Sequence, residues 1–120
     1  MKDTTIKENI IQEKTFSFSL SIIELYQKML QKNEYVLSKQ LLRSATSIGA
    51  NVNEASAAQT KKDFIAKMSI ASKEARETSY WLQLLNKSKL ADVVVKQQIN
   101  DCDEIIRILT AIVKTAQTNH

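Results

Sequence analysis

The residues best placed to form a reactive site are carboxylates in the middle of the chain. Glu54 falls in one expected helix, and Glu74 and Glu77 fall in the next. Antiparallel helices could bring these groups together, as the carboxylate sites of di-iron bundles require. Such sites also need a Glu-x-x-His from each of two further helices, yet the one histidine is the last residue, His120. We therefore expect no metal, and predict a buried ion pair between Arg43 and a glutamate, or a serine and asparagine hydrogen-bond network.

No other pattern indicates catalysis. The one cysteine, Cys102, lies on an apolar stripe, where a buried and inert thiol is expected. The chain holds no glycine-rich phosphate loop and no GxSxG segment. Tyr80 and Trp81 could stack on bases, but a tryptophan at the end of a helical seam is more often core or interface. We expect no enzyme activity, no catalytic residue and no cofactor.

The charge of the chain is uneven. Its net charge is +4, and between Lys61 and Leu90 seven basic residues accompany three acidic ones. Such an excess is typical of a polyanion-binding face, although a solvated helix face gives the same pattern. The candidate phosphate-contacting residues are Lys39, Arg43, Lys61, Lys62, Lys67, Lys73 and Arg76.

The elements that position these groups are helices. A chain of 120 residues with one glycine and no proline has little to build tight turns from. We predict a single all-α domain over residues 1–120, an antiparallel up-down-up-down four-helix bundle. No apolar run approaches the length that crosses a bilayer, and the N-terminal segment has no apolar signal core, so no membrane contact and a cytoplasmic location are expected. The predicted helices span about 15–32, 36–58, 61–86 and 92–117.

Helix ends and core faces follow from local patterns. Thr15 or Ser17 is predicted to cap the first helix, Thr60 the third and Asp92 the fourth. Gly49 lies inside the second helix, where it costs about 1 kcal/mol relative to alanine. We expect a close backbone approach to offset that cost where the second and third helices meet.

Apolar periodicity predicts the buried rows, which include Leu41 and Ile48 in the second helix and Met68 and Leu82 in the third. In the first helix, Phe16, Leu20 and Ile23 recur at helical spacing, with further apolar residues widening the stripe. Helix four carries two apolar rows, and helix three adds Ile70 and Trp81 outside its seam. This is more apolar surface than one small bundle can bury, which favours self-association.

Three segments together resemble a known family: EKTFSF, SKQLLRSATSIGANVNEA and DFIAKMSIASKEARETSYWLQLL. They are similar to the four-helix-bundle proteins first noticed as reading frames inside intervening sequences of bacterial 23S ribosomal RNA genes. The resemblance implies a ring-like homopentamer. It also implies kinship to the accessory variability determinant of diversity-generating retroelements, whose basic pentamer binds nucleic acid and a reverse transcriptase.

The functional hypothesis combines the charge and the resemblance. We expect a non-enzymatic protein that binds nucleic acid, RNA in particular, or acts as a ribonucleoprotein accessory protein, in the form of a basic homo-oligomer. The expected partners are further copies of itself, RNA or DNA, and a reverse transcriptase or another protein. The alternative is a protein-interaction scaffold that presents its helix faces to a protein partner without nucleic acid.

Overall fold

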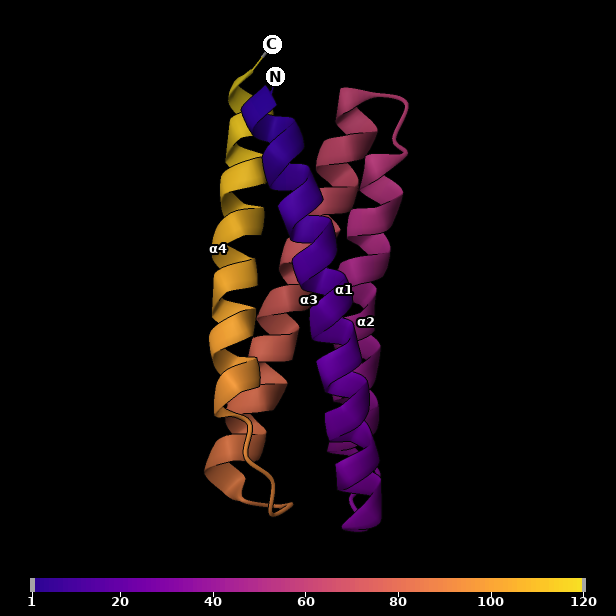
Figure 1. The fold of residues 1–120 in the computed structure, drawn as a ribbon, viewed down its shortest axis with the longest axis vertical. Coiled ribbons are helices and arrows are strands. Elements are labelled where there is room, and N and C mark those ends of the chain that lie inside the picture. Colours follow the sequence, from indigo (N-terminus) through magenta and orange to yellow (C-terminus); the bar gives the residue numbers. More distant parts are fainter. Residues whose placement is uncertain (1, 120) are drawn as a thin grey trace.

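The computed structural model describes residues 2–119, with side chains from Glu8 onward. Its four helices run alternately up and down the bundle, and each packs against two neighbours (Figure 1). The joint between α2 and α3 lies at the same end as both termini, and the other two joints lie at the opposite end. The predicted all-α four-helix architecture is confirmed. The helices are α1 (Lys2–Gln31), α2 (Leu37–Ser56), α3 (Lys61–Ser88) and α4 (Lys96–Thr118).

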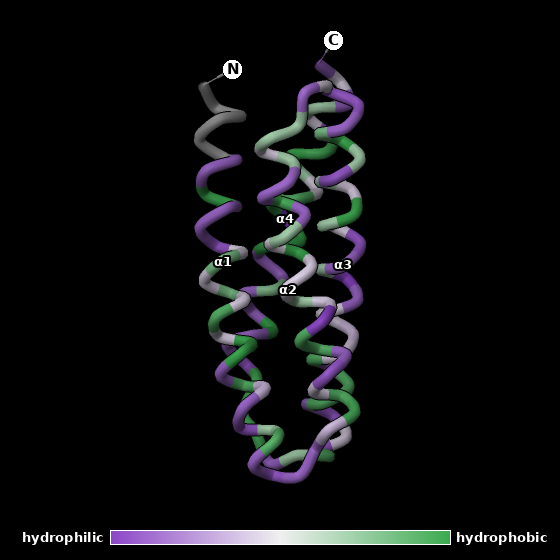
Figure 2. The backbone as a smooth tube through the Cα atoms, turned by 90° about the vertical axis from the view of Figure 1, so that its right-hand side faces the viewer, coloured by the Kyte–Doolittle hydropathy of each residue, from purple (hydrophilic) through white to green (hydrophobic). Residues whose placement is uncertain are grey.

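The central pair of helices follows the predicted pattern. The expected rows of α2 and α3 are buried, including Leu41 and Ile48 on one and Met68 and Leu82 on the other. Hydrophilic and hydrophobic segments alternate along each helix, as amphipathic helices around one core require (Figure 2). The Thr60 hydroxyl caps α3 by accepting a hydrogen bond from the Asp63 amide at 3.0 Å, as predicted. No helix in the described part of the chain is both long and apolar enough to span a bilayer.

The first helix differs from its prediction. It begins at Lys2, so Thr15 lies inside it and its hydroxyl donates to the Ile11 carbonyl at 2.7 Å instead of capping the helix. The predicted row faces outward: Phe16 is 68% exposed and Leu20 51%. The longer helix extends a competing row upstream, with spacings of four and three residues, and this row forms the core. The buried residues of that row are Ile11, Thr15, Phe18, Ile22, Leu25 and Met29.

The fourth helix also begins elsewhere than predicted. Asp92 lies in the extended joint, and the residue before the first turn is Val95, which offers no side-chain cap. The second apolar row of this helix was expected to be partly exposed, but its residues Ile105 and Ile112 are buried in the core of the bundle. The large exposed apolar side chains of the helices lie on α1 instead, and on α3, where Ile70 is 43% exposed.

Gly49 marks a close approach between helices, but with a different partner from the one predicted. A Cβ atom at this position would lie 3.4 Å from the Ser19 hydroxyl oxygen and 3.5 Å from the Thr15 carbonyl oxygen. Both neighbours belong to α1, so Gly49 faces α1 and not α3.

A buried carboxylate organises the joint between α1 and α2. Asn33 has a φ of 64°, and the Glu34 amide donates to the Met29 carbonyl at 2.9 Å, which closes α1 in a Schellman turn. The Glu34 carboxylate then accepts hydrogen bonds from the amides of Leu37 at 3.0 Å and Ser38 at 2.7 Å. Glu34 thus satisfies amides at the start of α2, a role that sequence reasoning missed because glutamate is not a usual capping residue.

The environment of Glu34 changes its acidity. Burial raises the pKa of the carboxyl, but the hydrogen bonds from the amides of Leu37, Ser38 and Val36 outweigh burial and lower the pKa below its usual value. A carboxyl with a lowered folded-state pKa stabilises the fold above its unfolded-state pKa. That contribution is lost as the pH falls through the lower, folded-state value.

We predict that Glu34→Gln lowers the free energy of unfolding by about 1 kcal/mol at neutral pH, in the range of helix-capping contributions. Chemical unfolding at several pH values measures this difference. It should shrink as the pH falls below about 4.5, because the carboxyl of the unfolded wild type then takes up a proton while the folded carboxyl stays charged to lower pH. Glu24→Gln, on the exposed surface of α1, is the control and should change little. A difference that stays constant down to pH 3 would contradict the charged cap.

Candidate functional site

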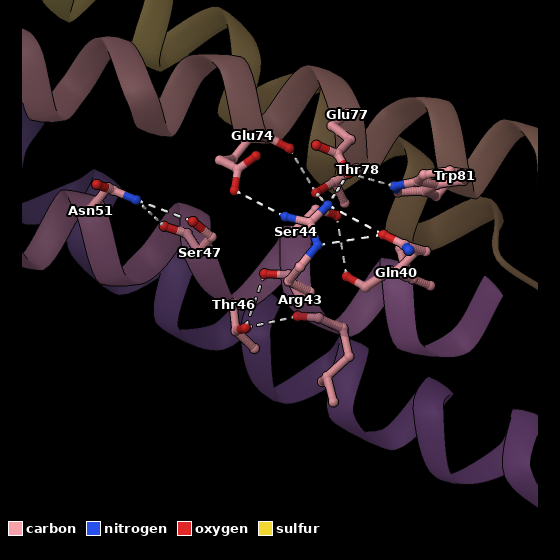
Figure 3. Close-up of polar contacts among 12 residues, drawn as sticks. Gln40, Arg43, Ser44, Thr46, Ser47, Asn51, Glu74, Glu77, Thr78 and Trp81 are labelled. Carbon is pink, nitrogen blue, oxygen red and sulfur yellow. Dashed lines mark hydrogen bonds and ion pairs between the residues drawn. The ribbon is translucent and has the colours of Figure 1, made fainter. Parts of the chain in front are cut away.

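Arg43 connects α2 to two carboxylates of α3 (Figure 3). Its Nη1 lies 3.5 Å from Glu74 Oε2, and its Nη2 forms an ion pair with Glu77 Oε2. The predicted ion pair is therefore present. It is not buried as expected, since the Arg43 side chain is 51% exposed, so its effect on stability is that of a partly solvated surface network.

The Glu77 carboxylate has two partners, Trp81 on α3 and Arg43 on α2. The Trp81 indole nitrogen donates to Glu77 Oε2 at 2.9 Å, one turn along α3. This hydrogen bond is the largest cause of a lowered pKa at Glu77, and the Arg43 charge adds to it against the opposing effect of burial. Trp81 packs against the core and is engaged by Glu77, whereas Tyr80, its edge-to-face neighbour at 5.2 Å, is 60% exposed.

A buried hydroxyl pair crosses between α2 and α3. Thr78 Oγ1 donates to Ser44 Oγ at 2.9 Å, and both residues are fully buried. The other predicted polar group stays within α2, where the Asn51 amide donates to the Ser47 carbonyl at 2.9 Å. Each hydroxyl also lies near a carbonyl of its own helix, Thr78 near Glu74 at 2.8 Å and Ser44 near Leu41 at 3.3 Å. The cross-helix bond therefore adds to the native register of α2 against α3 without being the sole partner of either hydroxyl.

The remaining reactive groups are structural. Cys102 is buried as predicted, and its thiol donates to the Ala75 carbonyl at 3.2 Å. Burial, with the nearby charges of Asp103 and Asp101, raises the pKa of this thiol to about 12, so the reactive thiolate is scarce at neutral pH. Among the residues that the structure describes, no three His, Cys, Asp or Glu side chains gather closely enough to hold a metal ion.

Two of the candidate phosphate-contacting residues are engaged by acids on the face that joins α2 and α3. One is Arg43, described above. The other is Lys67, whose Nζ lies 3.0 Å from Glu54 Oε1. Neither side chain offers its full charge to an external anion, because the neighbouring carboxylates share it.

The other candidates do not form one patch. Lys39 lies in the first turn of α2, at one end of the bundle, while Lys61 and Lys62 begin α3 at the opposite end (Figure 1). Lys73 and Arg76 lie between them on α3, and all five are exposed. The Arg76 guanidinium reaches toward α4 and donates to Thr110 Oγ1 at 3.4 Å.

Sequence reasoning missed the cations of α4, because it summed the charge of the whole segment. Lys96, Arg107 and Lys114 are spaced by eleven and seven residues, which places them in one row along the helix. The acids Asp101 and Glu104 lie on a different side, where Lys14 of α1 pairs with Glu104 at 2.8 Å. Counting the charges separately on each face of α4, instead of over the whole segment, would have found this row.

These contacts define a class of protein: an antiparallel four-helix bundle whose internal polar groups hold helices together and whose cations lie on outer faces. The family described as 23S rRNA-intervening sequence proteins matches residues 7–111, and the chain belongs to this family. The recognition made from the sequence motifs is thereby confirmed.

A solved structure agrees with both family and fold. The chain is similar to a protein of unknown function from the S23 ribosomal protein family of Bacteroides thetaiotaomicron, with 44% sequence identity and a TM-score of 0.83. The similarity covers 90% of this chain and 98% of that one. No curated protein matches the chain significantly.

We predict that Arg43→Met lowers the free energy of unfolding by about 0.5–1 kcal/mol, as expected for a partly exposed network. The loss of the guanidinium should also raise the pKa of Glu77, which NMR titration of the side-chain carboxyls would measure. Lys39→Met, a nearby exposed residue, is the matched control for the lost charge. Unchanged stability together with an unchanged Glu77 titration would show that Arg43 has no structural role.

Proposed function

We propose that this protein is a non-enzymatic nucleic-acid-binding or ribonucleoprotein accessory protein that acts in the cytoplasm as a basic homo-oligomer. The observation that carries the proposal is the placement of charge on α3. The acids Glu74 and Glu77 are engaged toward α2, while Lys73 and Arg76 are exposed away from that contact. The positive charge of these two basic residues on α3 thus faces the solvent, and the carboxylates of the same helix do not neutralise it.

Self-association is supported by an apolar stripe on α1, which we define as Phe16, Leu20 and Ile23. These side chains are 68%, 51% and 39% exposed, and their spacing of four and three residues places them on one face. Phe16 borders a groove of about 380 Å³ between α1 and α2, with Gly49 among its lining residues. A contiguous exposed apolar surface of this kind is typical of a protein–protein contact, and here we assign it to a second copy of the chain.

In an oligomer the basic surfaces add. Each chain contributes a net charge of +4, so a ring would bring several such surfaces within reach of one polyanion. Multivalent attachment of this sort raises overall affinity without any new kind of contact. The exposed candidates Lys61, Lys62, Lys73 and Arg76 would then contact phosphates, with RNA as the expected nucleic acid and a reverse transcriptase or another protein as a possible further partner.

We predict that Phe16→Glu combined with Leu20→Glu dissociates the oligomer, because two carboxylates would have to be buried in an apolar contact. Light scattering of the wild type should give a multiple of 13.6 kDa, and the double variant should give that mass itself. Val94→Glu, at an exposed apolar position outside the stripe, is the control and should leave the mass unchanged. A monomeric wild type would contradict the assembly.

We predict that the wild-type protein binds a structured RNA at low salt and that affinity falls steeply as salt rises, because neutralised phosphates release counterions. Binding is measured by fluorescence anisotropy on RNA and on a DNA duplex. Lys61→Glu with Lys62→Glu should weaken binding to all sequences alike. The control, Lys28→Glu with Lys32→Glu at the C-terminal end of α1 and just beyond it, makes the same change of charge elsewhere. Absence of binding to either nucleic acid at low salt would refute the proposed function.

A further inference from the structure

The surface between α3 and α4 gathers cations from both helices. Positions eleven residues apart share a side of a helix, which groups Lys62 with Lys73 and Arg76 with Lys87. Arg76 bonds to α4 through Thr110, so this side of α3 is the one next to α4. The acids of α3 lie on the other side, toward α2, where Glu74 and Glu77 bind Arg43.

The row of cations on α4 lies on the same surface. Lys114 lines a groove together with Arg76, and Lys96 and Arg107 share its row by spacing. One acid, the half-buried Asp103, belongs to that row as well. We call this surface the α3–α4 basic face, and its seven cations are Lys62, Lys73, Arg76, Lys87, Lys96, Arg107 and Lys114.

This face contains a groove of about 260 Å³. Arg76 and Lys114 border it, and the hydroxyl groups of Ser69, Ser72 and Thr110 complete much of its wall. No carboxylate lines it. Its size is below that of a usual small-molecule site, about 300–1,000 Å³, but cations with hydroxyl donors are the groups that contact phosphate oxygens in nucleic-acid complexes.

The groove on the other side of α4 has the opposite character. Glu13, Asp101 and Glu104 line it, with Lys14 as its cation. A phosphate would be repelled there and attracted to the α3–α4 side, so α4 separates two surfaces of opposite sign. This contrast gives a polyanion one preferred side of the molecule.

We propose that the α3–α4 basic face is the nucleic-acid track of this protein, with a backbone phosphate seated between Arg76 and Lys114. The inference rests on the proposed function and deepens it by naming the site. Arg76 supplies a planar fork and Lys114 a point charge, a pair suited to one phosphate. From Lys62 to Lys87 the helix rises about 38 Å, which matches about eleven base pairs of a duplex. The proposed ligand is a phosphodiester backbone, which the face recognises by its charge and not by its base sequence.

The test compares two variants with equal loss of charge, R76Q/K114Q in the groove and K28Q/K32Q, with Lys28 in the last turn of α1 and Lys32 just after that helix. Affinities for an RNA duplex and a DNA duplex of the same sequence, each longer than the track, are measured between about 50 and 200 mM salt. Removal of two phosphate contacts should weaken R76Q/K114Q about tenfold and reduce the salt slope on DNA by about 1.8, while K28Q/K32Q stays near the wild type. T110E, which adds a carboxylate beside Arg76, should lose affinity as well with both cations still present.

Each other outcome overturns the assignment in a recognisable way. If the wild type binds and both charge variants lose the same affinity, binding depends on net charge and not on this groove. The proposed function then stands, and the assignment of the site is wrong. If the wild type binds neither duplex, the proposed function itself fails. Competition by millimolar inorganic phosphate would indicate a site for small anions. If R76Q/K114Q changed the mass of the oligomer but not the affinity for the duplexes, the face would be a contact between copies of the chain.

Discussion

The register between α2 and α3 is the constraint on which the other features depend. A buried hydroxyl pair, Thr78 on Ser44, links the two helices at their centre. At that register Arg43 meets Glu74 and Glu77, and farther along the pair Lys67 meets Glu54. A slide by one helical turn would leave the hydroxyls without these partners and separate the ion pairs. The same register therefore sets both the packing of the core and the pairing of the surface charges.

The consequence for charge is a molecule with distinct sides. Pairing between α2 and α3 uses much of the negative charge of α3 locally. The cations that remain lie toward α4, whose own acids lie mostly toward α1. A modest net charge of +4 is thus compatible with one strongly basic surface. The rotation of each helix therefore decides where the positive charge lies on the surface, which the number of lysines in the chain does not.

The success of sequence reasoning varied with how many alternatives each helix offered. For α2 and α3 a single unbroken row of apolar and small residues left one way to face the core, and residues such as Ile48 and Met68 are buried as predicted. The sequence of α1 contains two apolar rows, one through Phe16 and one through Phe18. Only the row through Phe18 continues to Ile11 in the longer helix, and it is this row that is buried. The capping role of Glu34 could not be predicted from its residue type, because it depends on the turn that brings the carboxylate to the amides at the start of α2. Of the cations on the α3–α4 basic face, sequence reasoning selected Lys62, Lys73 and Arg76 but not Lys87. It also passed over those of α4, because summing the charge along the segment concealed their common face.

The turn that Glu34 forms also bears on how the chain folds. Its hydrogen bonds join residues between Met29 and Ser38, and none of them requires α3 or α4. Contacts so near in sequence cost little loop-closure entropy and favour rapid formation. The reversal between α1 and α2 can therefore form before the bundle is complete, so that the chain enters the search for its remaining contacts already bent into a hairpin.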